Sequence, residues 1–360
     1  MRIGIDCRTI LNPEKGEKAG VGHYTLFLIR NLLKIDQENE YVLFFDEDFK
    51  KEQIKNVVGE HKKVKICFLK KGKIPFLNSH VFIAGKIRQE KCDVFHAPGG
   101  ILPFFYKGKS IITIHDLAIY KHPEWFPENF IQRFISTKIL VPRGIKLANY
   151  IIVPSEATKK DCMEIFGLSA EKILMIPHGV ELPFEIDDVR DKYQIHGKYF
   201  LFIGTVEPRK NLIRLIHAFQ SLKNPDYFLI IAGGRGWKSD DVFLEIEKTQ
   251  NVRYLGYINE SDKFSLMKYA TAFVFPSLYE GFGLPVLEAR AVGTRVITSN
   301  ISSLPEVARE GSLLVDPYNE SEIGLALKSI INSKEQGRNE FHGFSWEKTA
   351  GKTLNLYNTF

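Results

Sequence analysis

The sequence predicts an α/β protein built from two doubly wound domains with parallel sheets. The chain has 360 residues, which is about twice the ~100–200 residues of one domain. Short Val- and Ile-rich runs that are apolar on both faces alternate with longer segments of helical periodicity, as in parallel sheets covered by helices. The alternation stops in an acidic, proline-containing stretch at 180–193 and then starts again. We therefore expect domains at 1–180 and 181–343 and a terminal helix at 344–360.

In the first domain the expected strands are short and separated by longer segments. They are RIGIDC (2–7), YVLFF (41–45), VKICFL (64–69), VFHA (94–97), IITIHD (111–116) and YIIVPS (150–155). Between the first two strands, residues 24–34 place Leu26, Ile29, Leu32 and Leu33 on one face, which predicts a helix.

The second domain repeats this layout. Its expected strands are YFLFIG (199–204), YFLIIAG (227–233), VRYLG (252–256), AFVFPS (272–277) and TRVITS (294–299). Its expected helices are at 211–222, 261–270 and 284–293, and a last helix is expected at 346–360.

Composition excludes several classes of protein. The chain is 44% hydrophobic, 12% aromatic and 26% charged, an ordinary globular mixture and not that of a disordered, collagen-like or coiled-coil chain. No apolar run approaches the ~20 residues of a membrane span, and MRIGIDCRTI at the start has no apolar stretch typical of a signal peptide. The four cysteines have no CxxC spacing, which argues against a zinc or redox motif. We expect a cytoplasmic protein.

The charge is uneven along the chain. Residues 1–180 hold 28 Lys+Arg and 20 Asp+Glu, a net +8, whereas residues 181–360 hold 21 and 23, a net −2. The basic half is either an ordinary solvated surface or a surface for an anionic membrane or an acidic acceptor. Nucleic acid is not an expected partner, because no zinc finger, RNP or helix-turn-helix signal accompanies the charge.

The strongest motif is SLYEGFGLPVLEA (277–289), which lies between an expected strand and an expected helix. Ligands of such sheets bind at the carboxyl ends of the strands, beside helix N-termini. Glycines allow backbone amides to approach a ligand closely, and Pro285 suits the first turn of a helix. The carboxylates of Glu280 and Glu288 are acceptors for the hydroxyls of a sugar or a ribose.

A second motif, FIGTVEPRKNLIRLI (202–216), places two cations at the start of a helix. Arg209 offers a planar fork of donors and Lys210 a point charge, so the pair predicts a phosphate site.

Three further features have weaker signals. The loop Gly20-Val21-Gly22 is either a phosphate-binding loop or a plain flexible loop. His115, at the end of a strand and next to Asp116, is either a structural histidine or a group that binds a hydroxyl or stabilises charge. The acidic run at 46–48 is more typical of a solvated turn than of a metal site.

Other classes of function fit less well. A nicotinamide dehydrogenase requires G-x-G-x-x-G directly after a strand, and the chain has no such motif; Thr25 stands where the third Gly or Ala is required. A non-catalytic, two-lobed sugar-binding protein would also have a cleft between two domains. That function would not account for the adjacent cations Arg209-Lys210 or for the paired glutamates. A metal-dependent transferase that uses Asp46 and Asp48 remains a third alternative.

The spacing Glu280-x7-Glu288 around Gly-Phe-Gly-Leu-Pro resembles that of the retaining glycosyltransferases of family four, which have the GT-B fold. The resemblance extends over most of the chain. It includes Gly20-Val21-Gly22, His115-Asp116, Val153-Pro154-Ser155, Pro177-His178-Gly179-Val180, Gly204 to Asn211, Gly233-Gly234, Gly256-Tyr257 and Phe344-Ser345-Trp346.

The resemblance implies two Rossmann-like domains that face each other across a cleft. The domain at 1–180 would bind the acceptor, the domain at 181–343 would bind a nucleotide-diphosphate sugar, and the helix at 344–360 would pack back on the first domain. Arg209 and Lys210 would contact the diphosphate, Glu280 the hydroxyls of the donor sugar, and Glu288 the ribose.

The resemblance also implies roles for backbone groups and for His115. Gly20 and Gly22 would lie near the phosphate and sugar, and His115 near the sugar. The amides of Phe282, Gly283 and Leu284 would hold the distal phosphate and sugar. Gly281 would belong to the same donor site.

One departure from the family concerns the end of the first strand of the second domain, where many members have Gly-Arg. This chain has Gly204-Thr205, and its arginine is Arg209. The pattern G-T-x-x-P-R-K-N is similar to that of mannosyltransferases of surface-polysaccharide pathways.

The subgroup implies mannose transfer from GDP-mannose to a saccharide or a lipid-linked saccharide, without a metal or other cofactor. A UDP-sugar-dependent glucosyl- or N-acetylhexosaminyl-type transferase of the same fold is the alternative. The basic first domain, with the segment at 128–146, would give peripheral contact with the inner face of the membrane.

Overall fold

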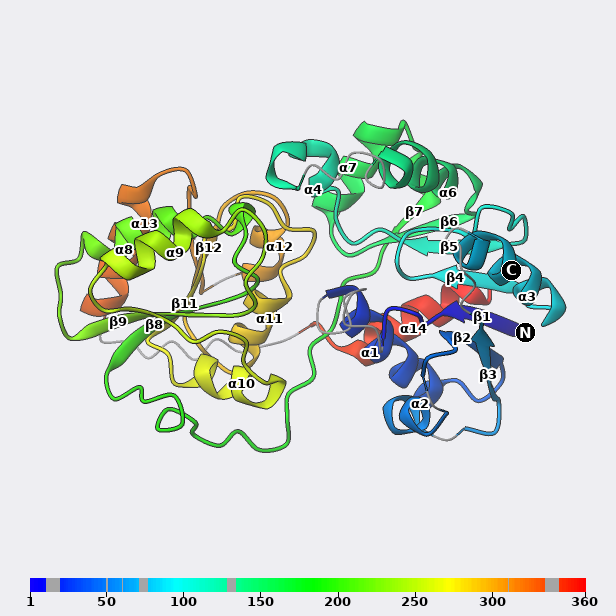
Figure 1. Ribbon diagram of the computed structural model, residues 1–360, viewed down its shortest axis with the longest axis horizontal. Coiled ribbons are helices and arrows are strands. Elements are labelled where there is room, and N and C mark those ends of the chain that lie inside the picture. The colour runs from blue at the N-terminus through cyan, green and yellow to red at the C-terminus, as the bar shows by residue number, and fades with distance from the viewer. Residues whose placement is uncertain are drawn as a thin grey trace. The chain divides into compact units, whose positions relative to one another are not determined.

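The chain forms two compact units. The computed structural model describes residues 1–10, 20–49, 51–59, 61–70, 77–127, 134–309, 311–333 and 343–360. Unit 1 comprises Met1–Leu117, Glu128–Gly179 and Phe344–Phe360, and unit 2 comprises Ala118–Pro127 and Val180–Gly343 (Figure 1). Ala118–Pro127 lies within the first half of the sequence but is packed with unit 2; we call this segment the strap.

Unit 1 contains a parallel sheet in the order β3-β2-β1-β4-β5-β6-β7. Its strands are β1 (Arg2–Asp6), β2 (Glu40–Asp46), β3 (Val64–Leu69), β4 (Val94–Ala97), β5 (Ser110–Thr113), β6 (Tyr150–Val153) and β7 (Ile173–Met175). β1, β4, β5 and β6 are almost completely buried, which explains their Val- and Ile-rich composition.

Helices cover both faces of this sheet (Figure 1). On one face α1 packs against α14 and α2, and α3, α6 and α7 lie on the other. The helical elements are α1 (Gly20–Ile35), α2 (Lys51–Val58), η2 (Leu77–Phe82), α3 (Ile83–Gln89), η4 (Ile135–Leu140), α6 (Val141–Leu147), α7 (Glu156–Phe166), η5 (Ala170–Lys172) and α14 (Trp346–Tyr357).

The core of unit 1 fills the layer between the sheet and the α1–α14 pair. Tyr24 and Leu28 of α1 and Tyr357 of α14 are fully buried in the same cluster as Ile3 and Ile5 of β1. The last helix therefore supplies part of the core of the unit that contains the start of the chain.

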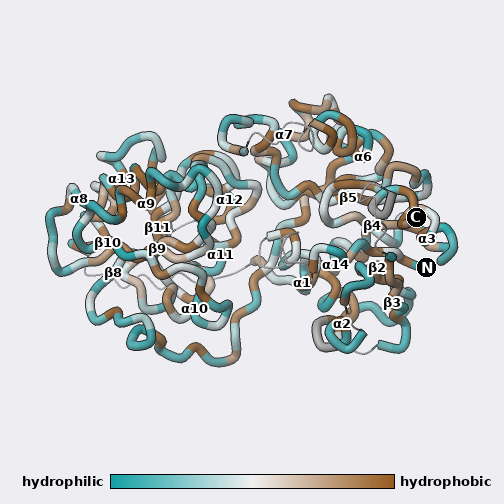
Figure 2. The backbone as a smooth tube through the Cα atoms, viewed as in Figure 1, coloured by the Kyte–Doolittle hydropathy of each residue, from teal (hydrophilic) through white to brown (hydrophobic). Residues whose placement is uncertain are grey.

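Unit 2 contains a parallel sheet in the order β10-β9-β8-β11-β12-β13. Its strands are β8 (Lys198–Ile203), β9 (Tyr227–Ala232), β10 (Val252–Tyr254), β11 (Ala272–Phe275), β12 (Val296–Ser299) and β13 (Leu313–Val315). Figure 2 shows hydrophobic stretches along the strands of both units and hydrophilic stretches along many of their connections.

The helices of unit 2 also form two layers. α8 packs against α9 and α13, whereas α11 packs against α10 and α12. The helical elements are α4 (Ala118–Lys121) and η3 (Pro123–Trp125) in the strap, and η6 (Pro208–Lys210), α8 (Leu212–Gln220), α9 (Asp240–Lys248), α10 (Glu260–Lys268), α11 (Leu284–Ala291), α12 (Leu304–Ala308) and α13 (Glu320–Asn332). In the described residues no helix is long and apolar enough to cross a bilayer.

Candidate active site

The strand order of unit 2 creates a switch point between β8 and β11. β8 lies beside β11, and the helices that follow them, α8 and α11, belong to opposite helical layers. In open α/β sheets such a point leaves a crevice at the carboxyl ends of the two strands, where ligands bind. The segments that leave β8 and β11 there are 204–211 and 276–283, the two strongest motifs of the sequence.

The segment after β8 turns sharply before α8 begins. Pro208–Lys210 form one 3₁₀ turn, and Asn211 then adopts a left-handed conformation with φ 61°. The Asn211 side chain holds the turn because its Nδ2 donates to the carbonyls of Pro276 (3.1 Å) and Pro317 (2.6 Å). The Leu278 amide donates to the Arg209 carbonyl at 2.8 Å, so the two motifs are joined through their backbones.

This turn directs both cations at the carboxylate of Glu280. Lys210 Nζ lies 2.5 Å from Glu280 Oε1, and Arg209 Nη1 lies 3.1 Å from Glu280 Oε2. Arg209 Nε also pairs with Glu207. The side chains of Lys210 and Glu280 are only 8% and 9% exposed, so the cluster is a desolvated set of charges and not a surface ion pair.

The electrostatics of the cluster follow from burial and from neighbouring charge. Burial raises the pKa of Glu280, but the charges of Arg209 and Lys210 outweigh burial, so its pKa lies below the usual value. Burial and the adjacent Arg209 charge lower the pKa of Lys210. Glu280 is also fixed through its backbone, because the hydroxyls of Ser302 and Ser303 donate to its carbonyl at 2.6 and 2.9 Å.

A glycine turn separates Glu280 from the N-terminus of α11. Gly283 has φ +103°, and a Cβ there would lie 2.8 Å from Leu304, so this position requires glycine. Leu284 and Pro285 then begin α11. The first amides of a helix have no intrahelical partner and favour an anion, and here only Gly281, Phe282 and Gly283 separate them from Glu280.

Glu288 is the centre of a second buried pair. Its Oε1 lies 2.6 Å from Lys263 Nζ, at the start of α10, and the two side chains are 7% and 11% exposed. Lys263 also pairs with Glu260. Burial raises the pKa of Glu288, although Lys263 opposes this change. Sequence reasoning did not identify Lys263, which lies outside the motifs, or Glu207, which lies inside the 202–216 motif but was not singled out. Only the three-dimensional structure pairs Lys263 with Glu288 and Glu207 with Arg209.

The remaining predicted residues lie in unit 1. Gly20 begins α1 and Gly22 lies in its first turn, so the expected loop is the start of a helix. His115 follows β5 and its Nε2 lies 2.9 Å from the Pro98 carbonyl. Its ring is packed edge-on against Tyr24 of α1 at a centroid distance of 4.8 Å. Unit 1 therefore brings His115 close to the second turn of α1.

The acidic run at 46–48 is divided between the core and the surface. Asp46 ends β2 as a buried residue whose charge acts on Arg8, whereas Glu47 and Asp48 are exposed. No group of three or more His, Cys, Asp or Glu suited to a metal ion occurs in the residues that the structure describes.

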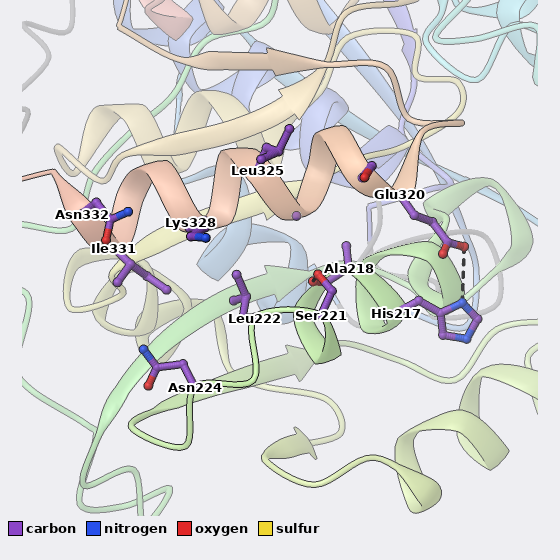
Figure 3. Close-up of a pocket in the computed structure, with 12 residues that line it drawn as sticks. His217, Ala218, Ser221, Leu222, Asn224, Glu320, Leu325, Lys328, Ile331 and Asn332 are labelled. Carbon is purple, nitrogen blue, oxygen red and sulfur yellow. Dashed lines mark hydrogen bonds and ion pairs between the residues drawn. The ribbon is translucent and has the colours of Figure 1, made fainter.

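A cavity of about 480 Å³ lies between α8 and α13 (Figure 3). It is lined by residues such as Leu222, Leu325 and Lys328, and His217 and Glu320 are in contact at one end (3.3 Å). None of the predicted site residues lines it, so the candidate site is the charged cluster at the switch point.

Comparisons with known proteins assign the chain to a family. Residues 185–341 match the family described as glycosyl transferases group 1, and residues 19–183 match glycosyltransferase family 4. The chain is 30% identical to O-antigen chain mannosyltransferase B of Escherichia coli, over 96% of this chain and 97% of that protein. The chain belongs to the family 4 glycosyltransferases, as its motifs predict.

A second relative matches a shorter part of the chain, and solved structures share its fold. O-antigen chain mannosyltransferase RfbU of Salmonella typhimurium strain LT2 is 31% identical over 61% of this chain and 60% of that protein. Sucrose-phosphate synthase of Thermosynechococcus elongatus superposes with a TM-score of 0.78 at 20% identity, covering 100% of this chain and 98% of that one. Anabaena HepE, solved in complex with UDP and glucose, superposes with a TM-score of 0.74 at 16% identity and complete coverage of both chains. The expected GT-B architecture is confirmed.

Proposed function

We propose that the chain transfers a hexose from a nucleotide-diphosphate sugar to a saccharide acceptor with retention of configuration. The observation that carries the proposal is the buried cluster of Arg209, Lys210 and Glu280 at the carboxyl ends of β8 and β11. Two cations next to the first turn of α11 suit a diphosphate, and a carboxylate beside them suits the hydroxyls of the attached sugar.

The charges of this cluster suggest how the donor would bind. In the structure Glu280 pairs with both cations. A diphosphate would take over part of this pairing and leave Glu280 free to accept hydrogen bonds from the sugar. Glu288 would accept from the ribose, in the position that its pairing with Lys263 fixes.

The reaction places negative charge where the cations lie. The bond between the anomeric carbon and the phosphate oxygen breaks, and the bond to the acceptor oxygen forms on the same face. The acceptor proton passes to an oxygen of the departing diphosphate. Arg209, Lys210 and the amides at the start of α11 would stabilise the developing charge, which is a large contribution in a buried site, and His115 would contact the sugar. We expect this step to be independent of metal.

We propose GDP-mannose as the donor, because relatives of the chain are named as O-antigen mannosyltransferases. A UDP-sugar is the alternative, and the HepE structures in complex with UDP and with UDP-glucose favour it. The thermal stability of the purified protein, measured with GDP, UDP and their sugars, distinguishes the two. A ligand at 100 times its Kd adds about 2.7 kcal/mol to the stability of the folded state.

We expect a shift with GDP and GDP-mannose that persists in EDTA and is lost in Lys210→Ala. A shift with UDP alone would assign the alternative donor. A shift abolished by EDTA would contradict the metal-independent site, and no shift with any nucleotide would contradict the proposed function.

A lipid-linked acceptor would bring unit 1 to a membrane surface. Phe134, Ile135, Lys138 and Ile139 in and next to η4 are exposed, an arrangement that suits the interface of an anionic membrane; residues 128–133 of the expected segment lie outside the described residues. We expect co-sedimentation with phosphatidylglycerol vesicles that is weakened by Phe134→Ser with Ile139→Ser. Equal binding of both proteins would contradict this surface.

A further inference from the structure

The strap places several aromatic side chains at one edge of unit 2. The charged cluster of Arg209, Lys210 and Glu280 lies at the same edge. His122, Trp125 and Phe126 belong to the strap, and Trp237 belongs to the loop after β9. We call these four residues the aromatic shelf. His122 stacks on Trp125 at a centroid distance of 3.9 Å, and Phe126 lies 5.7 Å from Trp237.

Two hydrogen bonds from the loop after β9 hold the strap. Trp237 Nε1 donates to the Trp125 carbonyl at 2.7 Å, and Lys238 Nζ donates to the Glu124 carbonyl at 2.6 Å. The indole N–H is the only polar group of a Trp side chain, and here it is satisfied by the backbone. The rest of the Trp237 ring is an apolar surface, and the residue is 37% exposed.

The loop that carries Trp237 is joined to the loop that carries Arg209 and Lys210. The Val206 amide donates to the Gly234 carbonyl at 2.9 Å, and the Gly236 amide donates to the Val206 carbonyl at 3.0 Å. A Cβ at Gly236 would lie 2.7 Å from the Val206 carbonyl oxygen, so glycine is required for this approach. Trp237 therefore has a defined position relative to the cations.

The shelf also borders the residue that precedes Glu280. The rings of His122 and Tyr279 lie 6.2 Å apart, and Arg209 Nη1 donates to the Tyr279 carbonyl at 3.4 Å. Tyr279 is buried, whereas the rings of the shelf are half-buried or, for Trp237, exposed. The shelf therefore keeps accessible ring surface next to the chain segment that presents Glu280.

We infer that the aromatic shelf is the subsite for a pyranose ring of the saccharide acceptor. One face of a hexopyranose carries C–H bonds, and the face of an aromatic ring carries negative electrostatic potential, so the two surfaces are complementary. The Glu124 carboxylate at the edge of the shelf is 62% exposed and accepts hydrogen bonds from hydroxyls. A carboxylate beside aromatic rings favours a neutral polyhydroxylated ligand over a lipid chain.

This inference rests on the proposed function and extends it to the acceptor side. Tryptophan fluorescence tests it directly, because the chain has three tryptophans; Trp125 and Trp237 belong to the shelf, whereas Trp346 is a buried residue of unit 1. We expect α-linked mannobiose to change the emission in a saturable way and mannitol, which has no ring, to leave it unchanged. No response to mannobiose would overturn the inference.

Kinetics with the donor and an oligomannose acceptor provide the second test. Trp237→Ala should raise the acceptor KM at least tenfold and leave the donor KM and the rate of donor hydrolysis within twofold of wild type. Trp237→Phe should recover part of the loss, because it restores a ring but not the indole N–H. The matched control is Leu244→Ala, which removes an exposed apolar side chain of α9 outside the shelf.

Equal losses of donor and acceptor affinity in Trp237→Ala would overturn the inference, because they would indicate a displaced loop and not a lost stacking surface. Failure of the proposed function has a different result: no nucleotide then stabilises the protein, whatever mannobiose does to the emission. A nucleotide shift without any effect of mannobiose or of Trp237→Ala contradicts the shelf alone.

Discussion

Lys210 is the residue whose position most directly links the structure to the proposed chemistry. Its ammonium group is buried, contacts Glu280 at 2.5 Å and lies 4.9 Å from the ring of Phe275. A cation held in this way needs little reorganisation when charge develops on the leaving diphosphate. The same desolvation makes its loss costly, because the buried Glu280 carboxylate would lose one of the two cations that pair with it.

We expect Lys210→Ala to lower kcat/KM for the nucleotide sugar by about 10²–10³-fold, the usual cost of one preorganised donor to a transition-state charge. Steady-state rates with the donor identified by thermal stability measure this loss. Lys248→Ala, at an exposed position of α9, should retain wild-type rates. Wild-type turnover by the Lys210 variant would contradict its assignment.

Lys263 and Glu288 form the second buried ion pair of unit 2. Removing one partner of such a pair typically costs 3–5 kcal/mol, because the other charge remains buried without compensation. We expect Lys263→Met to reduce the free energy of unfolding by about this amount, and Lys263→Met with Glu288→Gln to recover most of it. Urea denaturation measures both variants.

The exposed pair Arg190–Asp188, whose side chains are 40% and 38% exposed, is the control for that experiment. Arg190→Met should change the free energy of unfolding by less than about 1 kcal/mol, the usual range for a surface pair. A Lys263→Met effect no larger than this would show that the buried pair does not hold Glu288 in place.

At the scale of elements, the loop between β11 and α11 has a backbone conformation that requires particular residues. Gly283 has φ +103°, which side chains rarely adopt, and a Cβ there would lie 2.8 Å from the Leu304 side chain, which would have to shift. Pro285 follows at the start of α11. The resulting turn places Glu280 and the first amides of α11 at the same edge of the sheet. This geometry explains why glycine and proline lie between the two glutamates.

We expect Gly283→Ala to lower the free energy of unfolding by about 1–3 kcal/mol, the usual cost of a strained backbone conformation, and to raise the donor KM. Gly351→Ala in α14 is the matched control. No atom lies within 4 Å of a Cβ at Gly351, and alanine is favoured over glycine in a helix by about 0.5–1 kcal/mol, so this variant should be as stable as wild type or more stable. Equal effects of both substitutions, measured by chemical denaturation, would contradict the special role of Gly283.

Element boundaries show where local sequence is informative and where it is not. The hydrophobic runs predicted most strands within a few residues, because buried strands must be apolar. The three-residue strands β7 and β13 were not predicted, whereas β10, of the same length, was predicted within the longer run VRYLG. A strand of three residues carries little periodicity of its own. The helix expected from residue 24 begins at Gly20, four residues earlier. The sequence Gly20-Val21-Gly22 is compatible with a loop and also with the first turn of a helix, so the sequence alone could not distinguish the two.

At the scale of the whole molecule, buried histidines make unit 1 sensitive to acid. Burial lowers the pKa of His96 to about 3, that of His115 to about 4, and that of His178 well below its usual value. All three belong to unit 1. Their depressed pKa values mean that the unfolded chain binds more protons than the folded unit once the pH falls below about 6.5.

We therefore expect the stability of unit 1 to be full above pH ~6.5 and to fall as the pH drops toward 4, by up to about 1.4 kcal/mol per pH unit for each histidine. Trp346, in the background Trp125→Phe with Trp237→Phe, reports on unit 1 alone. His96→Gln should reduce the slope, whereas His196→Gln, at a side chain that is 73% exposed, should not. Equal urea midpoints at pH 7 and pH 5 would contradict this account.

Local sequence patterns were sufficient to establish the class of the protein. Alternating buried strands and helices predict two parallel sheets, and the motifs at 204–211 and 277–289 identify the family. The same motifs predict Arg209, Lys210, Glu280 and Glu288 as site residues. These signals are local: a buried strand must be apolar over its whole length, and a strand–turn–helix junction requires glycine and proline at fixed positions.

Which charges form pairs, and which segments pack into the same unit, became known from the three-dimensional arrangement of the chain. The pairing of Lys263 with Glu288 and the packing of the strap on unit 2 join residues that are 25 and more than 110 positions apart. Such contacts depend on the strand order and on which face of the sheet each helix covers. They cannot be predicted from local sequence patterns. The strap is the clearest example, because its residues lie inside the first half of the chain, whereas its hydrogen bonds and its aromatic neighbours are in unit 2.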